Sequence, residues 1–174
     1  GTGATDASVA PVAVAMPDGV TFTEVASGNA HTCAIADDGA VWCWGIDGDG
    51  IHDAQGNDAH GPRLVRFPVD VVATTIDGYY HECVTADDGT AWCWGRDTEG
   101  HLGNGSTTDS VAPVQVAMSE DVAFTRVVTG GFHTCGLHAD GSPALYFHFS
   151  LAMMLLPMIQ SLSASDRKPS SSVK

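Results

Sequence analysis

The residues best suited to chemistry in this chain are its histidines and cysteines, and they follow a pattern. A His-x-Cys triplet occurs three times, beginning at His31, His81 and His133. Imidazole and thiolate are ligands that zinc prefers, and thiols also form disulfides or act as nucleophiles. A zinc site is disfavoured, because each full copy of the pattern supplies only one His and two Cys and lacks the tight Cys-x-x-Cys spacing of structural zinc sites.

The triplets belong to a longer internal repeat. The segment HTCAIADDGAVWCWG, residues 31–45, recurs as HECVTADDGTAWCWG, residues 81–95, and begins again as HTCGLHADG at His133. A glycine stands three positions before each His, at Gly28, Gly78 and Gly130. Because the histidines recur at one position of the repeat, a structural role is favoured over catalysis.

Each repeat is predicted to contain four short strands. The first is an alternating run such as residues 113–118, the second a run such as 124–128, and the last two form the hairpin that carries HTC and WCWG. Four strands per repeat of about 50 residues are typical of a β-propeller blade. The predicted fold is therefore all-β, a partial β-propeller of about two to three four-stranded blades over residues 1–143.

The hairpin register follows from its turn. Asp37, Asp38 and Gly39 form a three-residue loop with glycine where a left-handed residue is needed, so Cys33 is predicted to face Cys43 across the two strands. Both faces of this hairpin are then apolar, which suits a sheet packed between neighbouring blades.

The same register makes disulfides possible. Facing cysteines at the closer cross-strand distance are within disulfide reach, which predicts the bridges Cys33–Cys43 and Cys83–Cys93 and an oxidising compartment, extracellular or in the cell envelope. The alternative is pairs of buried thiols that act as small hydrophobic side chains. Cys135 is predicted to be a free thiol, because Leu145 occupies the place of its partner.

The order of these motifs, with a following Gly-x-Leu-Gly-x-Gly at residues 100–105, resembles the repeat of the regulator of chromosome condensation (RCC1) family. The cysteine-containing bacterial version is the most similar, and the resemblance covers about residues 1–143. Family members usually close a ring of about seven blades, so only part of a ring is expected here. The resemblance implies a protein-binding platform. Its alternatives are a guanine-nucleotide exchange factor for a small GTPase and an inhibitor of a secreted enzyme such as a β-lactamase.

An acidic loop after the first hairpin raises the possibility of calcium binding. Asp47, Asp49 and Asp53 could place carboxylates around one ion. However, Asp47 matches Asp97 of the next repeat, and the final Glu of an EF-hand loop is missing. A solvated acidic loop is therefore favoured, and no cofactor is expected.

The same loop is the predicted contact with a partner protein. It runs from Asp47 to Gly61 and differs most from its counterpart at residues 97–110, and loops on a rigid scaffold often carry recognition. Its candidate contact residues are Asp47, Asp49, His52, Asp53, Asn57, Asp58 and His60.

Charge and missing motifs exclude other classes of function. A net charge of −14 disfavours nucleic acid as a partner, and also a chromatin-bound exchange factor. The chain contains no Gly-x-Ser-x-Gly, His-Glu-x-x-His or phosphate-loop motif, so we expect it not to be an enzyme.

Residues 144–174 form an atypical tail that does not match the repeat. Its apolar run, residues 145–162, is long enough to span a bilayer, although Pro157 and Gln160 weaken that interpretation. The alternatives are a helix that covers the open blade edge, and an unrelated or out-of-frame terminus.

Incomplete blades have a further consequence. Gly1 in place of an initiator Met leads us to expect a fragment or a processed chain. An incomplete set of blades is expected to expose a terminal sheet face with its Trp residues, and therefore to self-associate through open blade faces.

Overall fold

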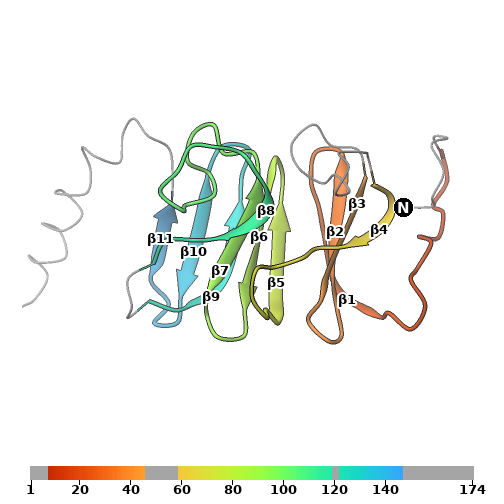
Figure 1. The fold of residues 1–174 in the computed structure, drawn as a ribbon, viewed down its shortest axis with the longest axis horizontal. Helices are drawn as coiled ribbons and strands as arrows, with labels where there is room; N and C mark the ends of the chain where they lie inside the picture. Colours follow the sequence, from red (N-terminus) through yellow and green to blue (C-terminus); the bar gives the residue numbers. More distant parts are fainter. Residues whose placement is uncertain (1–7, 46–58, 119–121, 147–174) are drawn as a thin grey trace, which may run out of the picture.

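The computed structural model describes residues 8–45, 59–118 and 122–146. This part of the chain is all-β and forms three antiparallel sheets that stand side by side (Figure 1). The first sheet has the order β1 (Phe22–Ser27), β2 (His31–Ala36), β3 (Val41–Gly45) and β4 (Ala59–Leu64). The second has the order β5 (Ala73–Gly78), β6 (His81–Ala86), β7 (Ala91–Gly95) and β8 (Ser110–Gln115). The third contains β9 (Phe124–Thr129), β10 (Thr134–His138) and β11 (Pro143–Tyr146).

The assignment of strands to sheets differs in one respect from the sequence prediction. The run predicted over residues 113–118 forms β8, which ends at Gln115 and pairs with β7 of the preceding repeat. It does not join β9 as the first strand of the following blade. Alternation of apolar and polar residues shows that a run can form a strand, but it carries no information about which neighbour the strand will pair with.

The two hairpins have the predicted register. Cys33 pairs with Cys43 and Cys83 with Cys93, and the turn glycines Gly39 and Gly89 both have a φ of 81°. Since a left-handed φ disfavours any residue with a Cβ atom, glycine at this position fixes the turn and thereby the register of the strands behind it.

Each disulfide lies between two sheets. Cys33 and Cys43 pack with Trp92 and Trp94 of the second sheet, while Cys83 and Cys93 pack with Phe124 of the third. The core is therefore repeated at each boundary between blades, as the two apolar faces of the hairpin predicted.

The expectation that the Trp residues of the terminal sheet are open to water is wrong for the first sheet. Trp44 is only 7% exposed, and its ring stacks on Phe22 with 5.8 Å between the ring centroids. Trp42 is half-buried. Phe22, at the start of β1, covers the face of the first sheet that carries Trp44. In the second sheet, the corresponding face is covered by the neighbouring blade.

The third sheet extends past the end of the recognisable repeat. In β11, Leu145 pairs with Cys135, so residues 144–146 complete a third hairpin without the WCWG motif. Backbone pairing needs no particular side chain, which is why the strand continues beyond residue 143. The apolar run to residue 162 lies outside the described residues apart from this strand. In the described part of the chain, no helix is long and apolar enough to cross a membrane.

Candidate functional site

Both predicted disulfides are present, and they are buried inside the array of blades. The Cα atoms lie 4.1 Å apart in Cys33–Cys43 and 4.2 Å apart in Cys83–Cys93. Cys135 is a half-buried free thiol, and burial raises its pKa. A raised pKa leaves less thiolate at neutral pH, so this environment does not activate Cys135 as a nucleophile.

The acidic loop of the sequence prediction lies almost wholly outside the described residues. This applies to the calcium candidates Asp47, Asp49 and Asp53, and to the predicted contact residues His52, Asn57 and Asp58. His60 lies in β4. In the ranges that the structure describes, no group of three or more His, Cys, Asp or Glu side chains is arranged to hold a metal ion.

The counterpart loop in the second repeat shows what the shared Asp does. Asp97 is fully buried, and its carboxylate oxygen Oδ1 accepts a hydrogen bond of 2.9 Å from the amide of Leu102. The amide of Asp97 in turn donates to Oδ1 of Asp109 at 2.6 Å. Burial raises the pKa of Asp97, the Leu102 amide opposes that shift, and the negative charge of Asp109 adds to it. Asp97 thus folds its loop back onto the sheet, and Leu102 fills the core beneath it.

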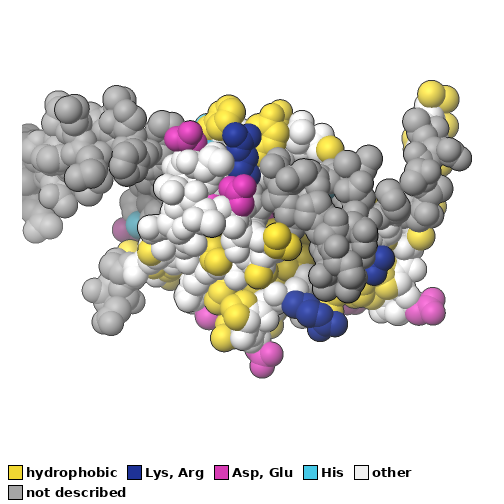
Figure 2. Space-filling view, turned by 45° about the horizontal axis from the view of Figure 1, so that its top comes forward, with side chains coloured by type: hydrophobic (Ala, Val, Ile, Leu, Met, Phe, Trp, Pro, Cys, Tyr) yellow, Lys and Arg dark blue, Asp and Glu magenta, His cyan; other side chains and the backbone are white. Residues whose placement is uncertain are grey.

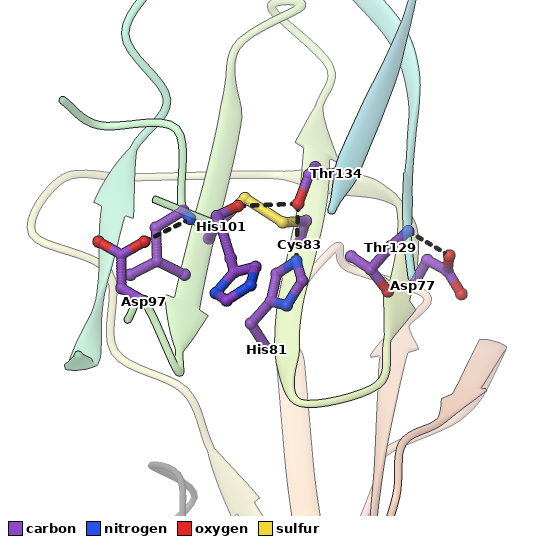
Figure 3. The surroundings of a disulfide bond; sticks show 9 residues. Asp77, His81, Cys83, Asp97, His101, Thr129 and Thr134 are labelled. Carbon is purple, nitrogen blue, oxygen red and sulfur yellow. Dashed lines mark hydrogen bonds between the residues drawn. A yellow bond between two sulfur atoms is a disulfide. The ribbon is translucent and has the colours of Figure 1, made fainter. Parts of the chain in front are cut away.

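The repeat histidine links each blade to the next (Figure 3). Nε2 of His81 lies 2.6 Å from Oγ1 of Thr134, and that hydroxyl donates to the carbonyl oxygen of His101 at 2.8 Å. Because the threonine hydroxyl has one proton and gives it to His101, His81 must donate from Nε2. His31 makes the equivalent contact with Oε1 of Glu82.

The environment of His81 disfavours its charged form. Burial, and to a smaller extent the nearby His101 and His133, lowers the pKa of His81 to about 3. The rings of His81 and His101 stack with 5.3 Å between their centroids. His81 is therefore a neutral connector between the second and third blades, in agreement with the structural role predicted for the repeat histidines.

An exposed aromatic surface lies at the rim where these histidines begin their strands. Tyr79 and Phe132 are 41% and 53% exposed. Tyr80 lies between them, with its ring centroid 4.7 Å from that of Tyr79 and 5.9 Å from that of Phe132. The guanidinium of Arg96 lies over both Tyr80 and Phe132, at 5.6 Å and 5.9 Å from the ring centroids. We call these four residues the rim cluster.

Figure 2 turns this rim toward the reader and shows a basic side chain above the second and third sheets, with hydrophobic side chains and an acidic one beside it. The hairpin turns lie at the opposite end of the sheets (Figure 1). The rim cluster therefore combines exposed aromatic rings with one cation on a face that loops, not strands, present to solvent.

The sequence prediction missed the rim cluster, although a signal for it exists. The two positions before the repeat histidine differ among the copies, being Asn29-Ala30, Tyr79-Tyr80 and Gly131-Phe132. These positions vary between repeats while the His and Gly around them do not, and two of the three copies carry an aromatic residue there. Exposed aromatic residues at such positions have no repeated packing role, and they indicate a binding surface.

The chain matches two family models, both described as "Regulator of chromosome condensation (RCC1) repeat", over residues 22–51 and 88–137. It is also similar to solved structures. Human WBSCR16 is 20% identical with a TM-score of 0.62, over 74% of this chain and 34% of that chain. Yeast RCC1 (Prp20), in its complex with Kap60, is 17% identical with a TM-score of 0.60, over 88% of this chain and 35% of that chain.

A third similar structure is the ectodomain of the receptor kinase CR4 from Physcomitrella patens, at 20% identity and a TM-score of 0.51. It is matched over 79% of this chain and 34% of that chain. The chain thus spans about a third of the length of these structures, and at such identities the similarity shows the fold. The sheets, the repeated motifs and both family models agree that the chain contains repeats of the RCC1 family.

Proposed function

We propose that this chain is a non-enzymatic protein-binding module that acts outside the cytoplasm and contacts its partner through the rim cluster. The observation that carries the proposal is the pair of exposed rings at Tyr79 and Phe132, which are joined by Tyr80, with Arg96 over Tyr80 and Phe132. Tyr and Arg are enriched among the residues that contribute most to protein–protein binding, and aromatic residues are enriched in interfaces generally.

The fold supports this proposal. The yeast neighbour was crystallised bound to Kap60, and another of its structures was described together with its binding properties to Gsp1p and histones. A rigid blade array that presents loops at one rim is suited to the same kind of contact here. The two buried disulfides support a location in an oxidising compartment.

We include the predicted contact loop, Asp47 to Gly61, in the proposed surface. Gly45 at the end of β3 pairs with both His31 and Ala59. These described residues on either side of residues 46–58 lie at the rim where the second and third blades carry the rim cluster, which supports a common surface.

Site-specific photo-cross-linking tests the proposal. A benzophenone amino acid is placed at Phe132, and in a matched control at Asp88 in the hairpin turn of the opposite rim. Both variants are exposed to the secreted and cell-envelope proteins of the source. We expect one protein to form an adduct at position 132, to be displaced by excess unmodified chain, and to form no adduct at position 88. Adducts of equal yield at both positions would contradict binding through this rim.

A nucleotide-release assay tests the alternative that the chain is a guanine-nucleotide exchange factor. The chain is added to a panel of small GTPases loaded with a fluorescent guanine nucleotide. We expect the release rate to stay at its intrinsic value, since no nucleotide-handling residues are recognisable. Accelerated release from any member of the panel would assign the chain to the exchange factors.

A further inference from the structure

Three contacts orient the side chain of Arg96, and a fourth fixes its backbone. Its guanidinium lies over the rings of Tyr80 and Phe132, and Nε donates to Oγ1 of Thr98 at 3.2 Å. Its backbone amide donates to the carbonyl oxygen of Tyr80 at 3.2 Å. An arginine fixed in this way loses little rotamer freedom when it binds a ligand, which favours tight binding.

The outer edge of this guanidinium has no protein acceptor in the described parts of the chain. Nε is bonded to Thr98, whereas the Nη atoms make no hydrogen bond or ion pair with any described side chain. This is notable in a chain with 21 acidic and 7 basic residues, where carboxylates are the most abundant available partners. A guanidinium that lies over aromatic rings still presents in-plane N–H groups, which match the two oxygens of a carboxylate.

The residues around Arg96 indicate what else the ligand would contain. Exposed Phe132 lies beside Arg96, and exposed Tyr79 packs on Tyr80, the other ring beside Arg96. An apolar group next to the carboxylate could therefore be buried against these rings. The net charge of −14 disfavours binding of a polyanion. It disfavours a single carboxylate that pairs with Arg96 much less.

We propose that the rim cluster recognises an Asp or Glu side chain of the partner protein that is followed or preceded by an apolar residue. Arg96 binds the carboxylate through its Nη atoms, and Tyr79 and Phe132 bind the apolar neighbour. This inference rests on the proposed function and names the chemistry that the rim cluster selects.

A peptide-display library of random dodecapeptides, panned against the complete chain, tests the proposal. Enriched peptides are expected to carry Asp or Glu next to an aromatic or aliphatic residue. Synthetic versions are then titrated against four variants, Arg96→Gln, Arg96→Lys, Phe132→Ala and the matched control Arg126→Gln. Arg126 is an exposed arginine of β9, away from the cluster. Circular dichroism and Trp fluorescence verify that each variant is folded.

The carboxylate proposal predicts a specific pattern of affinities. Arg96→Gln and a Glu→Gln change in the peptide should each weaken binding about tenfold or more, and together they should weaken it little further, because both remove the same ion pair. Arg96→Lys should restore only part of the affinity, since an ammonium cannot make the bidentate contact. Arg126→Gln should change the affinity less than about twofold.

Three results would overturn the proposal. Peptides whose binding is lost with Phe132→Ala but not with Arg96→Gln would show rim binding without carboxylate recognition, and would leave the proposed function standing. A phosphoserine peptide that binds far more tightly than its Glu counterpart would reassign the site to phosphate. Peptides indifferent to both Phe132→Ala and Arg96→Gln would contradict this inference and the proposed function together.

Discussion

The repeat histidine joins one blade to the next through its ring nitrogen, and the residue that receives it changes from boundary to boundary. His31 contacts the carboxylate of Glu82, whereas His81 donates to the hydroxyl of Thr134. Glu82 and Thr134 occupy the same repeat position, directly after the next histidine. The sequence alone could assign the histidines a structural role, but their partners lie 51 and 53 residues away, in a different sheet.

A prediction for His81 follows from its lowered pKa. The pKa of His81 is near 6.5 in the unfolded chain and about 3 in the folded chain. Between these pH values the unfolded chain binds a proton at His81 and the folded chain does not. The stability that His81 contributes is therefore complete above pH 6.5 and is lost as the pH falls toward 3, at up to about 1.4 kcal/mol per pH unit.

Urea denaturation at pH 7.5, 6, 5 and 4 measures this effect. In His81→Gln, which cannot take up a proton there, the free energy of unfolding should fall less steeply with acid than in the wild type. Parallel curves for the two proteins would mean that His81 is protonated in the folded state. At pH 7.5 the variant should be about 1–3 kcal/mol less stable, because the glutamine amide can still donate a hydrogen bond but does not fill the buried space of the imidazole that stacks on His101.

At the scale of elements, the hairpin turn contacts the next blade as well as its own. The carbonyl oxygen of Gly39 accepts from the amide of Ala73 at 3.0 Å, and that of Gly89 from the amide of Phe124 at 2.8 Å. A Cβ atom at position 89 would lie 2.7 Å from the Cβ atom of Ala123. Glycine is therefore required there by its φ and by the close approach of the neighbouring sheet.

Gly89→Ala and Gly141→Ala form a matched pair that separates these two causes. Both glycines have a φ near 82°, but a Cβ atom at position 141 meets nothing within 4 Å. Each variant should lose about 1–2 kcal/mol to the left-handed backbone, and Gly89→Ala about 1–3 kcal/mol more to the clash. Equal losses in thermal and urea unfolding would show that the contact between the blades is easily relaxed.

The disulfides are the second feature that stabilises the structure at the scale of elements. Each closes a loop with a sequence separation of 10, for which the chain-entropy argument gives about 2–3 kcal/mol. Replacing Cys83 and Cys93 by Ser should cost at least that much, since both sulfur atoms are buried. Cys135→Ser, at a half-buried free thiol, is the control and should cost far less. A double variant as stable as the wild type would show that the bridge does not restrict the unfolded chain.

How far the sequence predicts an element depends on the range of the interactions that define it. The hairpins, their register and their facing cysteines follow from a local turn and were all predicted. The pairing of β8 with β7 was predicted wrongly, because a strand can pair with either neighbouring repeat and its own residues do not decide which. The rim cluster was missed because it joins Tyr80, Arg96 and Phe132 from two blades, which become neighbours only in the folded array.

At the scale of the whole molecule, the third sheet leaves apolar surface open. Val128, Phe132 and Leu137 are 40%, 53% and 42% exposed. Blades are stabilised by the faces of their neighbours, so this surface predicts self-association of the 174-residue chain. The average mass in sedimentation equilibrium should rise with protein concentration, and Leu137→Asp should lower it. A monomer at all concentrations, with or without reductant, would contradict self-association.

The central claim is that the chain binds a partner protein through the rim cluster. The most direct test is calorimetric titration of the protein cross-linked at position 132 against the wild type, the double variant Tyr79→Ala/Phe132→Ala, and Asp88→Ala in the opposite turn. Truncated aromatic residues at the centre of an interface commonly cost about 2 kcal/mol each, so the double variant should bind at least about a hundredfold more weakly. Asp88→Ala should bind like the wild type. A double variant that is folded and binds within about twofold of the wild type would contradict the claim.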